Sequence, residues 1–120
     1  MSHIVSIHCK IHDPAAVAAA CARLGLAAPV QGTGKLFSGE AQGLIVQLPD
    51  WKYPAVIETL AGVVRYDNYE GSCGDQQHLD RFLQAYTVEK AKAEARKKGL
   101  ACSEQALADG SIKLHIQAGG

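Results

Sequence analysis

The stretch "LDRFLQAYTVEKAKAEARKKG", Leu79 to Gly99, decides the fold because it predicts one long helix between segments that resemble strands. Its apolar residues recur at helical spacing and predict a single stripe that packs on a sheet: Leu79, Phe82, Leu83 and Tyr86. Asp75 is suited to cap the start of this helix, and Gly99 is suited to end it. The cations just before Gly99 suit the C-terminal end of the helix dipole.

The segment that follows, "LACSEQALADGSIKLHIQ", predicts a β-hairpin. Asp109 and Gly110 are typical of a two-residue type I′ turn, which allows the strands on either side to pair directly. Such a turn sets the register, and the expected pairs are Leu107 with Ile112, Gln105 with Leu114, and Glu104 with His115.

The segment before the helix, "YPAVIETLAGVVRYDNY", contains two runs of β-forming residues around Leu60, Ala61 and Gly62, and so predicts a second hairpin. Further upstream, residues 27–53 resemble short strands broken by Gly and Pro, with "GLIVQL" as the best strand core. The pattern does not fix the number of strands there.

"GTGK", Gly32 to Lys35, resembles part of a phosphate-binding loop. The full pattern requires a glycine where Pro29 stands and Ser or Thr where Leu36 stands, and no clear strand-to-helix junction surrounds it. We therefore interpret this segment as a flexible turn.

The N-terminal part predicts one strand and one helix. In "HIVSIHCKIHD" apolar and polar residues alternate as far as Ile11, which is typical of a half-buried strand. In "DPAAVAAACARLGL", Asp13 is a good N-cap, Pro14 fits the first helical position and Gly25 is a good stop. The expected order is β-α-β-β-β-β-α-β-β in a single α+β domain, residues 1–120. It should form a mostly antiparallel sheet with two main helices packed on one face.

Charge and composition limit the function classes. Lys plus Arg and Asp plus Glu each number 12, so the formal net charge is zero. This balance argues against an unassisted nucleic-acid binder and favours self-association. The N-terminus does not resemble a signal peptide, and no apolar run is long enough to span a membrane. We expect a cytoplasmic protein with mostly reduced cysteines.

The histidines and cysteines do not form a metal-binding pattern. On a strand, His8 and His12 would lie about 13 Å apart, which one ion cannot bridge, and Cys9 would point to the opposite face. The four cysteines include no Cys-x-x-Cys pair. We therefore expect no bound metal and no cofactor.

The stretch "YDNYEGSCGDQQHLDRF", Tyr66 to Phe82, is interpreted first as a strand-to-helix junction and second as a binding surface. The residues expected to be free for a partner are Asp67, Asn68, Tyr69, Cys73 and Gln77. The alternative is a thiol-dependent enzyme or redox site, because Cys73 precedes a predicted helix N-terminus and His78 lies in its first turn.

Three segments together resemble the DUF1257 family of conserved hypothetical proteins, which includes members encoded in chloroplast genomes: "MSHIVSIHCKIHD", "LDRFLQAYTVEKAKAEARKKG" and "DGSIKLHIQ". Asp67-Asn68-Tyr69, followed by Gly71 and Gly74-Asp75, resembles bacterial members. Many relatives carry Trp near the position of Cys73, which argues against a nucleophile there.

The resemblance implies no activity and no catalytic residue. Relatives are often encoded near an AAA-type ATPase, which implies a partner or adaptor role. We therefore expect a non-enzymatic binding, adaptor or self-assembly module that forms a homo-oligomer. An AAA-type ATPase is a candidate protein partner.

Overall fold

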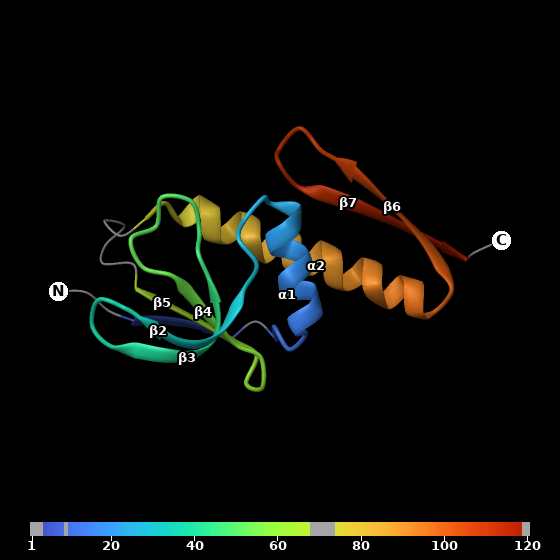
Figure 1. Cartoon of the computed structure of the whole chain (residues 1–120). Helices are drawn as coiled ribbons and strands as arrows, with labels where there is room; N and C mark the ends of the chain where they lie inside the picture. Colours follow the sequence, from blue (N-terminus) through green and yellow to red (C-terminus); the bar gives the residue numbers. More distant parts are fainter. Residues whose placement is uncertain (1–3, 9, 68–73, 119–120) are drawn as a thin grey trace.

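The computed structural model describes residues 4–8, 10–67 and 74–118 (Figure 1). These residues form an α+β fold with the element order predicted from the sequence. The elements are β1 (Ile4–His8), α1 (Pro14–Arg23), β2 (Val30–Lys35), β3 (Glu40–Val46), β4 (Ala55–Glu58), β5 (Val63–Asp67), α2 (Gln76–Lys97), β6 (Leu100–Ala106) and β7 (Ile112–Ala118).

Strands β1 to β5 form one antiparallel sheet in the order β1-β5-β4-β3-β2. The predicted hairpin around Leu60 is confirmed as β4 and β5, which pair through Ile57 and Val64. β1 pairs with β5, far along the chain, and places Ile4 opposite Asp67. The undecided region between residues 27 and 53 supplies β2 and β3, which form a hairpin of their own.

Both helices pack on one face of this sheet, as predicted. The core between them is buried and includes Val17, Ala20 and Cys21 of α1, Val46, Ile57 and Val64 of the sheet, and Leu79, Phe82 and Tyr86 of α2. Leu83 completes the predicted stripe as a partly buried residue. Trp51 packs edge-to-face on Tyr66, and its ring N–H donates to the carbonyl of Asp75 at 2.9 Å.

The predicted helix caps are confirmed. The Asp13 carboxylate accepts from the backbone N–H of Ala15 at 3.0 Å, and Asp75 accepts from that of Gln77 at 2.9 Å. Each bond satisfies a donor that the first helical turn leaves without a partner, a contribution of about 1 kcal/mol. The caps fix where the helices begin and therefore which residues face the sheet.

The predicted C-terminal hairpin is confirmed as β6 and β7, but it forms a two-stranded sheet of its own, a separation from the main sheet that the sequence did not predict. This C-terminal hairpin lies against the C-terminal half of α2 (Figure 1). Val88 and Ala95 are buried although they lie on the side of α2 about 180° from Leu79, so we infer that the hairpin covers this side.

The fold is elongated, 54 × 32 × 23 Å, with a radius of gyration of 15.2 Å against about 14 Å for a compact chain of this length.

The predicted register of the C-terminal hairpin is wrong by one residue. Ala106, not Leu107, lies opposite Ile112, and Glu104 lies opposite Leu114. The turn has three residues: Leu107 N–H donates to the Ser111 carbonyl at 2.9 Å, and Gly110 takes a positive φ of 89°. A three-residue turn with glycine in this conformation suits Asp-Gly as well as a type I′ turn does.

Two other predictions need correction. β1 ends at His8 and does not reach Ile11, because the chain turns at Lys10, which has a φ of 57°. The segment Gly32 to Lys35 is not a turn but part of β2. A Cβ on Gly34 would lie 2.6 Å from Val56 Cγ2, so the absence of a side chain at Gly34 leaves room for the Val56 side chain of β4.

Candidate interaction surface

A polar groove of about 330 Å³ separates α2 from the turn between β6 and β7. Gln84 joins the helix to the turn by donating from Nε2 to the carbonyl of Gly110 at 3.0 Å. The described lining of the groove consists of polar and charged side chains from one helix face together with the turn: Gln77, Asp80, Arg81, Gln84, Asp109 and Gly110. The groove therefore offers both hydrogen-bond donors and acceptors.

A smaller, more apolar hollow of about 120 Å³ adjoins this groove. Leu24 and Leu26, which follow α1, and Pro49, from the loop between β3 and β4, line it together with His78 and Arg81 of α2. Arg81 therefore borders both hollows. It is exposed and makes no ion pair with another described residue. We call the two hollows together the helix–hairpin surface.

An ion-pair network also joins the hairpin to both helices. Glu104 of β6 accepts from Arg23 at the end of α1 and from Lys92 of α2, the latter at 2.9 Å. Glu89 also pairs with Arg23, at 3.2 Å. The hydrogen bonds from Arg23 and then Lys92 lower the pKa of Glu104 from 4.5 to about 2. Glu104 in its charged form thus links the hairpin to both helices.

A second network joins the start of α1 to the middle of α2. Lys90 donates to the Asp13 carboxylate at 3.0 Å and to Glu94 at 3.0 Å. The hydrogen bond from Lys90 lowers the pKa of Asp13, although its partial burial acts in the opposite direction. Asp13 therefore acts both as the cap of α1 and as a link between the helices.

Of the residues expected to be free for a partner, Gln77 is exposed and lines the polar groove. Asn68, Tyr69 and Cys73 lie outside the described residues, so their expected roles stay predictions. Asp67 does not face solvent: its exposed fraction is 0%. It lies on the sheet face that points away from the helices, whereas Gln77 lies on the side of α2 that points away from the sheet.

Asp67 instead connects the end of β5 to the turn between β2 and β3. Its Oδ2 accepts from the backbone N–H of Ser38 at 3.0 Å and from the Ser38 hydroxyl at 3.1 Å. Its Oδ1 is buried without a hydrogen-bond partner among the described residues. This aspartate, expected from the sequence to be free for a partner, therefore holds the β2–β3 turn over the outer face of the sheet.

Of the two residues in the thiol alternative, the structure describes His78 only. His78 is half-buried in the first turn of α2, beside the apolar hollow, but Cys73 is not among the described residues. Burial raises the pKa of the Cys21 thiol, which suits a core residue, and Cys102 is half-buried in β6. Within the described ranges, no group of three His, Cys, Asp or Glu residues lies close enough to hold a metal ion.

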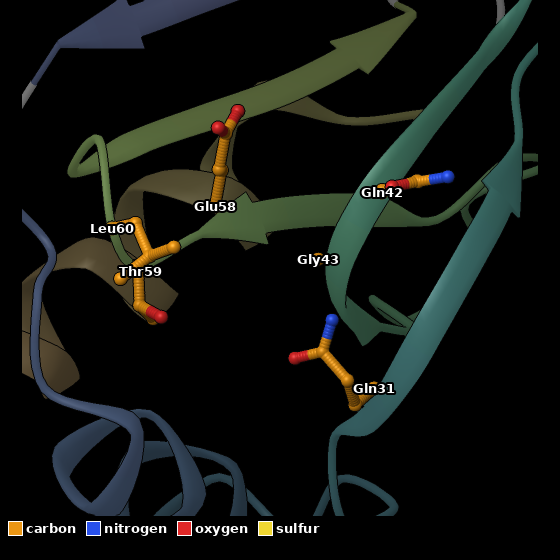
Figure 2. Close-up of a pocket in the computed structure, with 6 residues that line it drawn as sticks. All are labelled: Gln31, Gln42, Gly43, Glu58, Thr59 and Leu60. Carbon is orange, nitrogen blue, oxygen red and sulfur yellow. The ribbon is translucent and has the colours of Figure 1, made fainter.

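A third hollow, of about 380 Å³, opens between the β2–β3 hairpin and the turn after β4. Figure 2 shows Gln31 and Gly43 on one side of it and Thr59 and Leu60 on the other. Glu58, whose carboxylate also lines this hollow, forms an ion pair with Arg65. The described lining thus brings together amides, a hydroxyl and an aliphatic chain, a combination without an obvious reactive group.

The residues expected from the sequence to bind a partner include Gln77 but not Arg81, Gln84 or the apolar residues across from them. Gln77, Arg81 and Gln84 are spaced four and three residues apart, so they share one face of the helix. This polar helix face, opposite the apolar stripe, was the sequence feature that could have indicated Arg81 and Gln84. The contribution of Leu26 and Pro49 depends on tertiary packing and has no local signal.

Within the described part of the chain, no helix is both long enough and apolar enough to cross a membrane. Comparison of this chain with protein-family models, with curated proteins and with solved structures finds no match.

Proposed function

We propose that this protein is a non-enzymatic binding or adaptor module that captures a polypeptide segment at the helix–hairpin surface. The observation that carries the proposal is that Arg81, a cation without an ionic partner among the described residues, borders an apolar hollow and a polar groove at once. Such a combination suits a segment with an apolar side chain next to an acidic one.

The expected mode of binding follows from the geometry. An aliphatic side chain would enter the hollow formed by Leu24, Leu26 and Pro49. A neighbouring carboxylate would accept from the Arg81 guanidinium, which presents several donors in a fixed plane. The amides of Gln77 and Gln84 would bond main-chain groups of the same segment.

The test is a selection of displayed random peptides against the purified protein, followed by titration of the selected peptides. We expect binders that combine an aliphatic residue with Asp or Glu. Arg81→Ala should weaken their binding by about fivefold or more, because an arginine at the centre of a contact often contributes more than 1 kcal/mol. The matched control is Arg96→Ala, an exposed arginine on the last turn of the same helix.

Equal binding by Arg81→Ala and the parent protein, or equal loss in both arginine variants, would contradict the proposal. Capture of an AAA-type ATPase, the partner implied by the family resemblance, should depend on Arg81 in the same way. The thiol alternative predicts a different result, namely an activity or rapid alkylation that is lost on Cys73→Ser and unaffected by Arg81→Ala.

A further inference from the structure

The outer edge of β7 is a strand edge with which no other described strand pairs, so its backbone groups are available for a partner. Leu107 N–H donates to the Ser111 carbonyl, so this pair is hydrogen-bonded across the hairpin. Bonded and non-bonded pairs alternate along antiparallel strands. By this alternation, the backbone N–H and C=O groups of Ile112, Leu114 and Ile116 point outward, away from β6.

The other edge of the hairpin is less available. Glu104 of β6 is bonded to both Arg23 and Lys92, and α2 packs mainly against β6 and less against β7. The outer edge of β7 is therefore the less covered of the two edges. Its sequence, "IKLHIQA", contains no proline and no acidic residue, and Ile116 is 48% exposed. Two-stranded sheets are marginal alone and gain stability when strands are added.

We propose that β7 pairs antiparallel with β7 of a second copy of this chain, around a two-fold axis at Leu114. The result is a four-stranded sheet in which the two β7 strands lie at the centre and the two β6 strands at the edges. This inference is independent of the helix–hairpin surface, because it uses the edge of the sheet and not the groove.

The register at Leu114 is self-complementary. Ile112 lies opposite the partner's Ile116, so the apolar residues of both strands fall on one face of the joined sheet. Lys113 lies opposite the partner's His115, which keeps the two lysines apart. Both side chains belong to the polar face of the hairpin, on the same side as Ser103 and Gln105.

The distribution of charge also favours a second copy of this chain as the partner at the β7 edge. The antiparallel arrangement brings the turn of one copy, with Asp109, beside the end of the other copy's β7, near Ala118. Ala118 pairs with Leu100, which directly follows the basic last turn of α2, where Arg96 and Lys97 lie. Opposite charges therefore approach each other twice across the axis, and the zero net charge of the chain removes overall repulsion.

The pairing of one strand per copy buries an area at the low end for specific complexes, so we expect a dissociation constant on the order of micromolar. Sedimentation equilibrium between about 1 and 300 µM should show a monomer–dimer equilibrium centred in this range. Ile116→Pro should abolish the dimer, because it removes an outward N–H without breaking a bond to β6. Ile116→Ala, which keeps that N–H, should weaken it only several-fold.

The matched control is Ala106→Pro, which removes the corresponding outward N–H on the edge of β6 and should leave the dimer intact. A parent protein that is monomeric throughout, a dimer that survives Ile116→Pro, or equal loss in both proline variants would overturn the proposal.

Cross-linking tests the register whatever the proline variants do to the fold. Lys113→Cys and His115→Cys chains should form a mixed disulfide when combined, because residues opposite each other in a non-bonded pair have Cα atoms about 4.5 Å apart. Either variant alone, or the parent chain with its native cysteines, should cross-link far less. No preference for the mixed pair would contradict the Leu114 axis. A negative cross-linking result would contradict the dimer only, because the peptide-binding test at Arg81 does not depend on the β7 edge.

Discussion

The body of the molecule, made of β1 to β5 with α1 and α2, and the C-terminal hairpin differ in how much apolar burial and how much ion pairing hold them in place. In the body, Phe82, Ile57 and Val17 are fully removed from solvent and belong to one cluster. In the hairpin, Leu107 and Ile116 remain 40% and 48% exposed. Its link to the helices includes the charged bonds of Glu104 with Arg23 and Lys92.

This difference indicates two levels of stability in one chain. Burial of apolar area acts at all pH values, whereas an ion pair requires both charges and weakens with salt. The hairpin should therefore detach under conditions that leave the body folded. A surface attached in this way can change its position when a partner binds, at little cost to the core.

The largest expected effect belongs to the core of the body. Phe82→Ala should lower the free energy of unfolding by about 3–5 kcal/mol, because it removes a fully buried ring and leaves a cavity. Ile116→Ala, in the hairpin, should cost less than about 1 kcal/mol because this side chain is already half exposed. Urea denaturation followed by circular dichroism measures both, and similar losses would contradict the two-level description.

A smaller effect is expected where two strands of the body approach closely. A Cβ on Gly43 would lie 2.3 Å from the carbonyl oxygen of Ile57, and the φ of Gly43 is 156°. Gly43→Ala should therefore destabilise the fold by about 1–3 kcal/mol. Its cross-strand partner Gly32 is the control, since a Cβ there meets its nearest atom, in Ile45, at 3.7 Å. Thermal unfolding should separate the two variants clearly.

The smallest global effect is expected from the hairpin's ion pairs. Glu104→Gln should cost about 1 kcal/mol, because the partners are partly solvated. Hydrogen exchange should reveal more: amides of β6 and β7 should exchange faster in the variant, while those of β4 and β5 should be unchanged. Faster exchange throughout the chain would show that the hairpin and the body open together.

The ion pairs of Glu104 also predict that the attachment of the hairpin depends on pH. The pKa of Glu104 is lowered on folding from 4.5 to about 2, so its contribution to stability is complete above pH 4.5. The contribution decreases as the pH falls and is lost near pH 2. The difference in hairpin exchange between the parent protein and Glu104→Gln should therefore shrink across this interval. A constant difference would show that Glu104 stays charged or does not hold the hairpin.

The order of elements could be predicted because its signals are local. Asp13 and Asp75 mark the helix starts by chemistry that acts over three residues, and the stripe from Leu79 to Tyr86 depends only on helical spacing. The turn at Asp109 and Gly110 was located correctly. Its register was not, because both turn lengths suit the same two residues and a difference of one residue exchanges the strand faces.

What the sequence could not supply depends on contacts between distant segments. Asp67 resembles a turn residue locally, and only Ser38, 29 positions away, explains why it is buried. The end of β1 at His8 was equally hidden, because the alternation of apolar residues continues to Ile11 while the backbone does not. The groove beside Gln77 exists because the hairpin turn reaches Gln84, a contact that no local pattern records.

The pairing of β1 with β5 has a consequence for synthesis of the chain. Ile4 pairs with Asp67, so about 60 further residues must leave the ribosome before β1 finds its neighbour, which takes roughly 3 to 12 s at ordinary rates of translation. During that time the β2–β3 and β3–β4 pairs can already form, since their partners are close in sequence. The first strand to be made is thus the last to join its sheet, and the nascent chain carries an open strand edge until β5 emerges.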